Sequence, residues 1–314
     1  MLISECIKKI DDEFLSFCLL KDANFEAFAK ATDVRKSESI VFFDEDFIRG
    51  RYKFLDSVIQ NKFNNISAII LTNAHLDYIK NKCELDDRIG ILICDYPRYA
   101  FFVIREMIIA SDDRYKANHT FTKINKLSHI GNNVRVGEKI NVGSSTVIND
   151  NTIIEDGVSI GDNCSIGVSG YENVRKPNGL PFIVTHLGKT IIKKNTVIYS
   201  NVVINKALFS YDETIVGENC IIDSNNYIGH GTKMGKNVTI AAGCTILGNS
   251  RIGNDVKIYA GSTVRNRIDI RDKTIIGMGS AVITSTDEGE HVSGNFAFNH
   301  EDNINSWKKK KCKK

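Results

Sequence analysis

A histidine between two glycines, His230 in the segment NNYIGHGTKMG, is the residue of this chain best suited to acid–base chemistry. Histidine has the side chain whose unperturbed pKa suits proton transfer near neutrality. A histidine alone is most often an ordinary surface residue, but two neighbours favour a catalytic role. Gly248, eighteen residues further on, could offer a backbone N–H to an oxyanion, and Asp223 could orient the imidazole. A turn at a corner is an equal alternative for Asp223.

The other histidines and the cysteines carry less weight as catalytic or metal-binding residues. His186 lies in a segment expected to project from the fold, from where it could reach the site. No two histidines have HxxxxH spacing, so a three-histidine zinc site is unsupported. The 8 cysteines form no CxxC pair, and we expect Cys164, Cys220 and Cys244 to be buried and unreactive.

The eighteen-residue step matters because an aliphatic residue returns at every sixth position over much of the chain. A helix would show a period of 3.6 and a plain strand a period of 2. The six-residue period predicts a left-handed parallel β-helix, in which three hexads make one coil and Gly248 stacks next to His230. The aliphatic positions are Ile124, Ile130, Val136, Val142, Ile148, Ile154, Ile160, Ile166, Ile192, Ile198, Ile204, Val216, Ile222, Ile228, Met234, Ile240, Ile246, Ile252, Ile258, Val264, Ile270, Ile276 and Val282.

Two further positions of the hexad have a regular character. The residue four places after the aliphatic one is small or aliphatic, as at Val238 and Cys244, and we expect it to line the interior near a corner. Glycine often follows the aliphatic residue directly, as at Gly229 and Gly253. We expect these glycines to supply the backbone angles that a corner needs.

The repeat divides the chain into three parts. Residues 1–112 lack it and predict a small α/β domain, which could bind a nucleotide or only cap the first coil. Residues 121–287 predict the β-helix, with a projecting loop at about 168–190 that holds two of the chain's three prolines. Residues 288–314 form a short tail that ends in WKKKKCKK and is expected to be solvated.

Within the N-terminal part, three short apolar runs predict strands, and two segments predict helices. The strands are SIVFF, ISAIIL and IGILIC. A helical pattern opens the chain with Ile7, Ile10, Phe14 and Phe17, and a second helix is expected over 97–109 with Pro97 in its first turn.

Composition excludes some classes of protein. A net charge of +3 gives no broad affinity for nucleic acid or membranes. No apolar stretch reaches the length of a membrane span, and acidic residues interrupt the start MLISECIKKIDDEF, unlike a signal peptide. We therefore expect a cytoplasmic protein.

Residues 223–253, DSNNYIGHGTKMGKNVTIAAGCTILGNSRIG, resemble the matching region of bacterial UDP-3-O-acylglucosamine N-acyltransferases, which attach the second acyl chain in lipid A synthesis. The likeness extends to IGVSGYENV…HLGKTII, with Gly170 and Tyr171 at the family's Gly-aromatic pair. ISAIIL and ILICDYPRYAFFVI resemble the family's small uridine-binding domain. The similarity covers most of residues 35–300.

This resemblance implies a homotrimer with active sites between subunits, in which His230 is the general base and the Gly248 N–H forms the oxyanion hole. It also implies a nucleotide-linked amino sugar as acceptor and acyl-CoA or acyl carrier protein as donor, with no tightly bound cofactor. The residues expected to contact the substrate are Tyr171, His186, Asn225, Asn226, Phe43 and Phe47.

The sequence departs from the family in two places. The family's Asn-x-Lys-Tyr uridine motif is not evident, and the nearest stretch is FFDEDF, with Phe43 and Phe47 as the plausible stacking residues. The family's helical C-terminal extension corresponds here to only about thirty residues after the repeat. Both differences favour a relative that acts on another sugar nucleotide, for O-antigen or another surface glycan, with acyl-CoA as donor.

The main alternative is a non-catalytic β-helix that acts as a scaffold or binding module. Its ice-binding form fails because the outward positions are mixed Lys, Asn, Asp and Thr rather than threonine ladders. A sugar nucleotidyltransferase needs a glycine-rich loop near its start, but Gly50 is the one glycine in residues 1–60.

Overall fold

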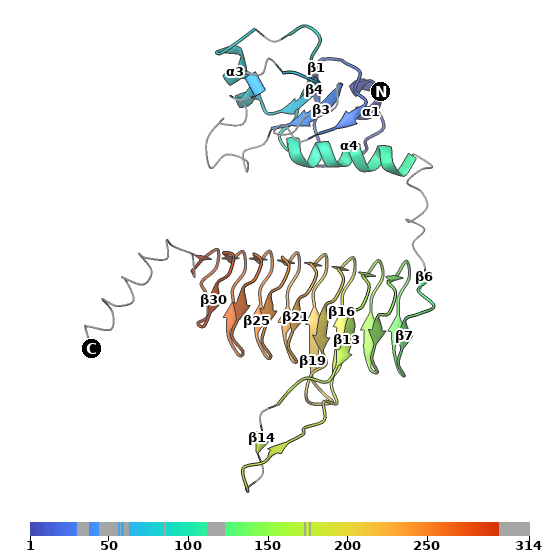
Figure 1. The fold of residues 1–314 in the computed structure, drawn as a ribbon, viewed down its shortest axis with the longest axis vertical. Coiled ribbons are helices and arrows are strands. Elements are labelled where there is room, and N and C mark those ends of the chain that lie inside the picture. Colours follow the sequence, from blue (N-terminus) through green and yellow to red (C-terminus); the bar gives the residue numbers. More distant parts are fainter. Residues whose placement is uncertain are drawn as a thin grey trace, which may run out of the picture. The chain divides into compact units, whose positions relative to one another are not determined.

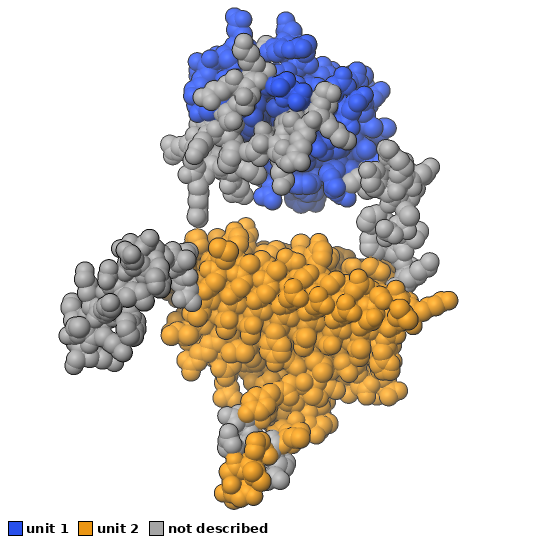
Figure 2. All heavy atoms as spheres, viewed as in Figure 1, with its two compact units in different colours: residues 1–120 blue, residues 121–314 orange. Residues whose placement is uncertain are grey.

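The computed structural model divides the chain into two compact units, Met1–Thr120 and Phe121–Lys314 (Figure 1, Figure 2). The structure describes residues 1–29, 38–43, 56, 58–59, 63–84, 86–111, 123–172, 174–175 and 177–294. The first unit is an α/β domain and the second is a stack of parallel strands in three sheets. The predicted fold class, a left-handed parallel β-helix with a small N-terminal α/β domain, is confirmed.

The N-terminal unit is built on a five-stranded sheet in the order β1–β5–β4–β3–β2. β1 is antiparallel to β5, and the other neighbours are parallel. The elements are α1 (Ile3–Ile7), β1 (Cys18–Lys21), β2 (Ala27–Phe28), β3 (Ser39–Phe42), β4 (Ile66–Leu71), α3 (Asn73–Lys80), β5 (Gly90–Ile93) and α4 (Pro97–Ser111).

Both faces of this sheet are buried, because its central strands are apolar at consecutive positions. Ile69 of β4 packs in one cluster with Leu76 of α3. The next residue, Ile70, packs in another cluster with Ile3 of α1 and Phe101 of α4. The sheet therefore has α3 packed on one face and α1 and α4 packed on the opposite face.

The two helix predictions have different outcomes. The helix that starts at Pro97 is confirmed as α4. The opening helix is shorter than predicted, because α1 ends at Ile7. Asp12 accepts a 2.9 Å hydrogen bond from the Phe14 N–H, and such local contacts compete with helix continuation.

The second unit consists of three parallel sheets that the chain visits in turn. The eight-stranded sheet contains β7 (His129–Ile130), β10 (Val147–Ile148), β13 (Ser165–Val168), β18 (Val203–Asn205), β21 (Tyr227–Ile228), β24 (Thr245–Ile246), β27 (Thr263–Val264) and β30 (Ala281–Val282). The seven-stranded sheet contains β8 (Arg135–Val136), β11 (Thr152–Ile154), β16 (Lys189–Ile192), β19 (Glu213–Val216), β22 (Lys233–Met234), β25 (Arg251–Ile252) and β28 (Asp269–Ile270). The nine-stranded sheet contains β6 (Lys123–Ile124), β9 (Asn141–Val142), β12 (Ser159–Ile160), β17 (Val197–Ile198), β20 (Ile221–Ile222), β23 (Thr239–Ile240), β26 (Lys257–Ile258), β29 (Ile275–Ile276) and β31 (His291–Val292).

The aliphatic residue of each hexad forms the core of the prism. Ile228 pairs with Ile246, and Ile246 pairs with Val264, so the register advances by one coil at each step. All three side chains are fully buried. Near the first coil the same position is partly open, since Ile124 and Val136 have a neighbouring coil on one side only within this unit.

Most of the glycines after the aliphatic residues serve a purpose that differs from the expected one, with Gly167 (φ 73°) as an exception. φ is not positive at Gly229, and a Cβ there would come within 2.5 Å of the Gly248 backbone nitrogen. Close approach of successive coils therefore requires glycine at this position. The left-handed backbone angle falls two residues later and is often held by asparagine, as at Asn225 (φ 62°) and Asn249 (φ 60°).

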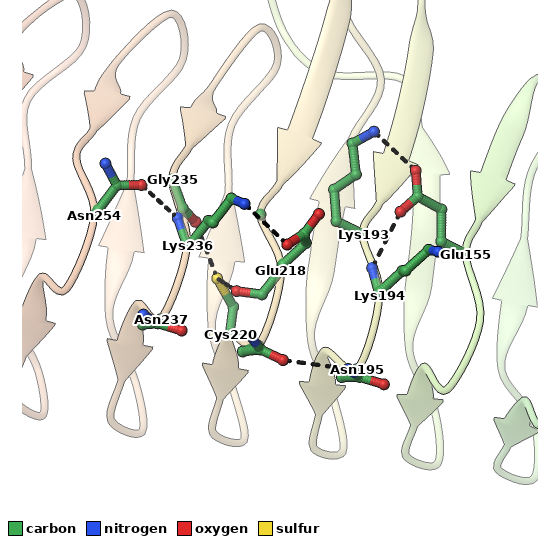
Figure 3. Close-up of polar contacts among 12 residues, drawn as sticks. Glu155, Lys193, Lys194, Asn195, Glu218, Cys220, Gly235, Lys236, Asn237 and Asn254 are labelled. Carbon is green, nitrogen blue, oxygen red and sulfur yellow. Dashed lines mark hydrogen bonds and ion pairs between the residues drawn. The ribbon is translucent and has the colours of Figure 1, made fainter.

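We call the corner between the seven- and nine-stranded sheets the ion-pair edge. Charged side chains here bind each other from coil to coil (Figure 3). Lys193 Nζ lies 2.8 Å from a Glu155 carboxylate oxygen, and Lys236 Nζ lies 3.1 Å from that of Glu218. The Lys236 N–H also donates to Asn254 Oδ1 at 2.9 Å. No insertion interrupts this edge, and its polar side chains pair with groups on neighbouring coils of the same edge.

The three interior cysteines are buried, as expected. Burial raises the pKa of the Cys220 thiol to about 11 and also raises the pKa of Cys164 and Cys244. Because a thiol must ionise to act as a nucleophile, none of them is suited to attack a thioester at neutral pH.

Candidate active site

Both interruptions of the repeat leave the prism at the corner between the eight- and seven-stranded sheets, which we call the insertion edge. Residues 169–188 connect β13 to β16 and carry an antiparallel hairpin, β14 (Val174–Arg175) and β15 (Pro181–Phe182), that projects from the prism (Figure 1). Residues 206–212 connect β18 to β19 in the next coil. His230 follows one coil later at the same edge, between β21 and β22.

His230 occupies a corner that is fixed by both neighbouring coils. Its carbonyl oxygen accepts a 2.7 Å hydrogen bond from the Asn249 N–H of the next coil. The Gly231 N–H donates to Thr214 Oγ1 of the preceding coil at 2.8 Å. The His230 side chain is 12% exposed, so the imidazole is held at the surface with little of it open to water.

Gly248 stacks directly on His230, at the place that the eighteen-residue spacing predicts. A Cβ added to Gly248 would lie 2.9 Å from His230 Nε2, so any larger residue would press on the ring. The Gly248 N–H donates no hydrogen bond within the described part of the chain. A free donor beside the imidazole is the arrangement that an oxyanion formed there would need.

The imidazole opens onto a hollow of about 430 Å³. A carboxylate oxygen of Glu172, from the projecting segment, lies 3.7 Å from His230 Nε2. The lining residues are Tyr171, Glu172, Tyr227, His230, Leu247, Gly248, Asn249, Asn266 and Arg267.

Burial lowers the pKa of His230, because a charged imidazole loses hydration there. Electrostatic interactions with His186 and Arg267 lower this pKa further, whereas Glu172 and Asp212 raise it. The lowering effects win, so the imidazole is neutral near pH 7 and can accept a proton.

A second imidazole lies on the buried side of the base. The His186 and His230 ring centroids are 5.2 Å apart, with the planes at 73°, and His186 is 2% exposed. Asn205, also buried, borders the same space. A Cβ added to Gly170 would lie 3.3 Å from each of these three side chains, so a larger residue here would require them to shift.

Three of the predicted substrate-binding residues stand apart from this hollow. Asn226 is a wrong prediction: its side chain is 2% exposed and bonds the backbone at Asp223, Ala241 and Cys244. Asn225 is exposed in a left-handed turn and is not part of the lining. Phe43 is a wrong prediction too, because it is buried in the core of the N-terminal unit and presents no free ring face. Phe47 lies outside the described residues.

Asp223 is not brought to His230 within one chain. Its carboxylate accepts a 2.7 Å hydrogen bond from the Ser224 N–H, which is the turn role considered as its alternative. It lines a different hollow, of about 550 Å³, together with Tyr199 and Tyr259. The two residues are seven positions apart, so they fall on neighbouring corners of the prism rather than on one edge.

Six lining residues were missed by the sequence reasoning: Glu172, Tyr227, Leu247, Asn249, Asn266 and Arg267. Asn266 lies one coil beyond Gly248, so extending the eighteen-residue step would have found it and its neighbour Arg267. Glu172 directly follows Tyr171, but its position depends on the path of an inserted segment that no repeat governs. The described residues contain no cluster of three or more His, Cys, Asp or Glu arranged to hold a metal ion. None of the described helices has the length and hydropathy to cross a bilayer.

Comparisons with known proteins agree with the repeat. Residues 213–248 match the family model described as bacterial transferase hexapeptide (six repeats). This segment contains His230 and Gly248. No curated protein matches the chain at a significant level of sequence similarity.

Similar solved structures include LpxA from Acinetobacter baumannii, at 18% identity over 61% of this chain and 76% of that one, with a TM-score of 0.42. A UDP-N-acetylglucosamine O-acyltransferase from Moraxella catarrhalis is 21% identical over 60% of this chain and 77% of that one, with a TM-score of 0.39. A perosamine N-acetyltransferase variant from Caulobacter crescentus was solved with CoA and GDP-perosamine. It is 12% identical over 81% of this chain and 93% of that one, with a TM-score of 0.30. At these TM-scores the likenesses do not establish a shared activity.

Proposed function

We propose that this chain is an acyltransferase that moves an acyl group from a phosphopantetheine thioester to the amino group of a nucleotide-linked amino sugar. The observation that carries the proposal is the His230 imidazole at the wall of a hollow, stacked on Gly248, whose N–H donates no hydrogen bond among the described residues. The match of residues 213–248 to the bacterial transferase hexapeptide model supports group transfer.

The amine attacks the thioester carbonyl in its neutral form, and a C–N bond forms as the carbonyl oxygen becomes an oxyanion. The Gly248 N–H donates to this oxyanion. His230 Nε2 takes the proton that the nitrogen loses on attack and then gives it to the departing sulfur as the C–S bond breaks. No covalent enzyme intermediate is needed, because both substrates can be held together in the hollow.

Glu172 supports an amine rather than a hydroxyl as the acceptor. A carboxylate 3.7 Å from the base attracts a sugar ammonium group into the hollow before it loses its first proton. A hydroxyl group carries no charge and would gain much less from that carboxylate. The acceptor we expect is therefore an amino sugar of a surface glycan or of lipid A.

We also expect the chain to act as a homotrimer in which a neighbouring subunit completes the groove for the donor. The hollow beside Asp223 carries half-exposed Tyr199 and Tyr259 and the aliphatic Ile221, and such a surface suits a contact between copies. Light scattering of the purified chain tests this state directly, and a monomer at working concentration would contradict it.

Activity is tested by incubating the full-length chain with acyl-CoA donors and a panel of UDP-, GDP- and dTDP-linked amino sugars. We expect thiol release and a product whose mass rises by one acyl group, with no product from the matching hydroxy sugars. His230→Ala should lower kcat by about 10²–10⁴-fold. His129→Ala, at an exposed histidine of β7, is the matched control and should leave kcat unchanged.

Two results would overturn the proposal. One is a His230→Ala enzyme with near-normal turnover. The other is equal acylation of amino and hydroxy sugars, which would remove the amine from the proposed acceptor. Replacing acyl-CoA by acylated carrier protein in the same assay decides between the two donors.

A further inference from the structure

The mechanism proposed above leaves a buried ionisable side chain next to His230 without a role. His186 is 2% exposed, and neither of its ring nitrogens has a hydrogen-bond partner among the described residues. A buried polar ring without partners costs stability relative to an apolar ring of the same shape. Within the described part of the chain, its one ring contact is with His230, at 5.2 Å between centroids.

We propose that His186 is a positioning residue that packs edge-to-face against the buried side of His230 and keeps Nε2 of that ring directed at the hollow. This inference rests on the proposed acyl transfer, in which Nε2 is the atom that takes the proton. The end of the projecting segment that returns to the prism supplies His186, whereas the end that leaves the prism supplies Gly170 and Glu172. The base is thus held between the two ends of one insertion.

The backbone around His186 is suited to this task. The Leu187 N–H donates to the Leu208 carbonyl and the Gly188 N–H to the Ala207 carbonyl, each at 2.9 Å. The segment that carries His186 is therefore tied to the next loop of the same edge. These bonds hold the backbone next to His186 in place, and burial of the ring limits its rotation.

His186 also influences the charge of the base. The titratable and charged groups that face His230 are His186 and Glu172 from the two ends of the first insertion, Asp212 from the second loop and Arg267 two coils further on. A proton on His186 opposes a proton on His230, since two charged rings this close repel each other. Removing His186 should therefore raise the pKa of His230 and reduce its neutral fraction at mildly acidic pH.

The test uses two variants of the full-length chain that separate packing from charge. In His186→Ala the ring loses its support, so we expect kcat to fall about 10–100-fold with both KM values within about twofold. In His186→Phe an aromatic ring of similar shape remains, so kcat at pH 8 should return to within about threefold of the parent. The acidic limb of the His186→Phe pH profile should lie at higher pH.

A second measurement needs no substrate. Diethyl pyrocarbonate modifies neutral imidazole, and the tryptic peptide between Lys206 and Lys233 reports His230 alone by mass spectrometry. The pH of half-maximal modification should be higher in His186→Phe than in the parent. Thermal melting should place His186→Phe at or above the parent Tm, because the two buried ring nitrogens of His186 that lack partners are then removed.

Each outcome decides the inference. Unchanged kcat and an unchanged modification midpoint in His186→Ala would overturn it. Equal loss of kcat in His186→Ala and His186→Phe, with no shift in midpoint, would also overturn it. Failure of the proposed function is distinguishable, since it shows as full activity in His230→Ala or as no acylation by the parent, while the modification midpoint still reports on His186.

Discussion

Two edges of one prism are built from the same hexad and behave differently. At the ion-pair edge the coils follow without interruption, and Lys193, Glu155, Lys236 and Glu218 neutralise one another (Figure 3). At the insertion edge two consecutive coils open into loops, and the next coil presents His230 to a hollow. The repeat itself therefore specifies a scaffold, and the departures from it specify the site.

The two edges also differ in how many of their buried polar side-chain atoms have hydrogen-bond partners. Among the described residues, six contain a buried side-chain nitrogen or oxygen without a hydrogen-bond partner, and five of the six lie at the insertion edge: His186, Thr190, Asn205, His230 and Thr232. Native proteins satisfy most such groups, and the exceptions gather at functional sites. This concentration is an independent reason to place the chemistry at the insertion edge.

The comparison predicts different costs for the same substitution at each edge. Gly248→Ala should lower kcat about 100-fold, because the new Cβ would lie 2.9 Å from His230 Nε2 and displace the ring. Gly235→Ala at the ion-pair edge would meet backbone of the next coil, so it should lower Tm and leave kcat unchanged. Steady-state kinetics and thermal melting of both variants check this, and the reverse pattern would contradict it.

A smaller effect is expected at the carboxylate that faces the base. Glu172→Gln should lower kcat/KM for the amino sugar by about 10-fold, the size of one modest charge interaction. Glu172 raises the pKa of His230, so its loss lowers that pKa and shifts the acidic limb of the pH profile to lower pH. Glu138→Gln, at an exposed corner, is the control. If the acidic limb of the pH profile does not move in Glu172→Gln, the proposed role of Glu172 beside His230 is wrong.

The smallest effect is expected at the ion-pair edge itself. Lys236 and Glu218 are largely exposed, and such pairs contribute about 0–1 kcal/mol. Lys236→Ala should lower the free energy of unfolding by less than about 1 kcal/mol and leave kcat unchanged. Urea denaturation and the acylation assay measure both. A large loss of activity here would break the distinction between the two edges.

The prism could be predicted well from the sequence, because an aliphatic residue at every sixth position marks the side chains that enter the core. The sequence also predicted the stacking of Gly248 on His230, since an uninterrupted eighteen-residue step returns to the same corner. The sequence-based prediction failed for residues whose side-chain position depends on more than the six-residue period. Asn226 looked like an exposed polar residue, but it fills an inner corner and bonds the backbone.

The inserted segments were the part of the site that could not be predicted in detail. His186 was expected to reach the groove from a projecting loop, and the structure instead buries it against the base. Glu172 escaped notice because the path of residues 169–188 is set by contacts with a neighbouring loop rather than by a repeat. In the N-terminal unit, Phe43 was misread because both faces of that sheet are covered.

The pairing of β13 with β18 and of β18 with β21 has a consequence for how such a protein can change. Ile166 pairs with Ile204 across the first insertion, and Ile204 pairs with Ile228 across the second, although the chain lengths between them differ. Longer or shorter segments can therefore be exchanged at this corner without altering the alignment of any rung, because closing a longer loop costs little extra entropy. The corner that carries His230 belongs to the next coil and would keep its register through such an exchange, whereas the contacts that His186 and Glu172 make with His230 would change.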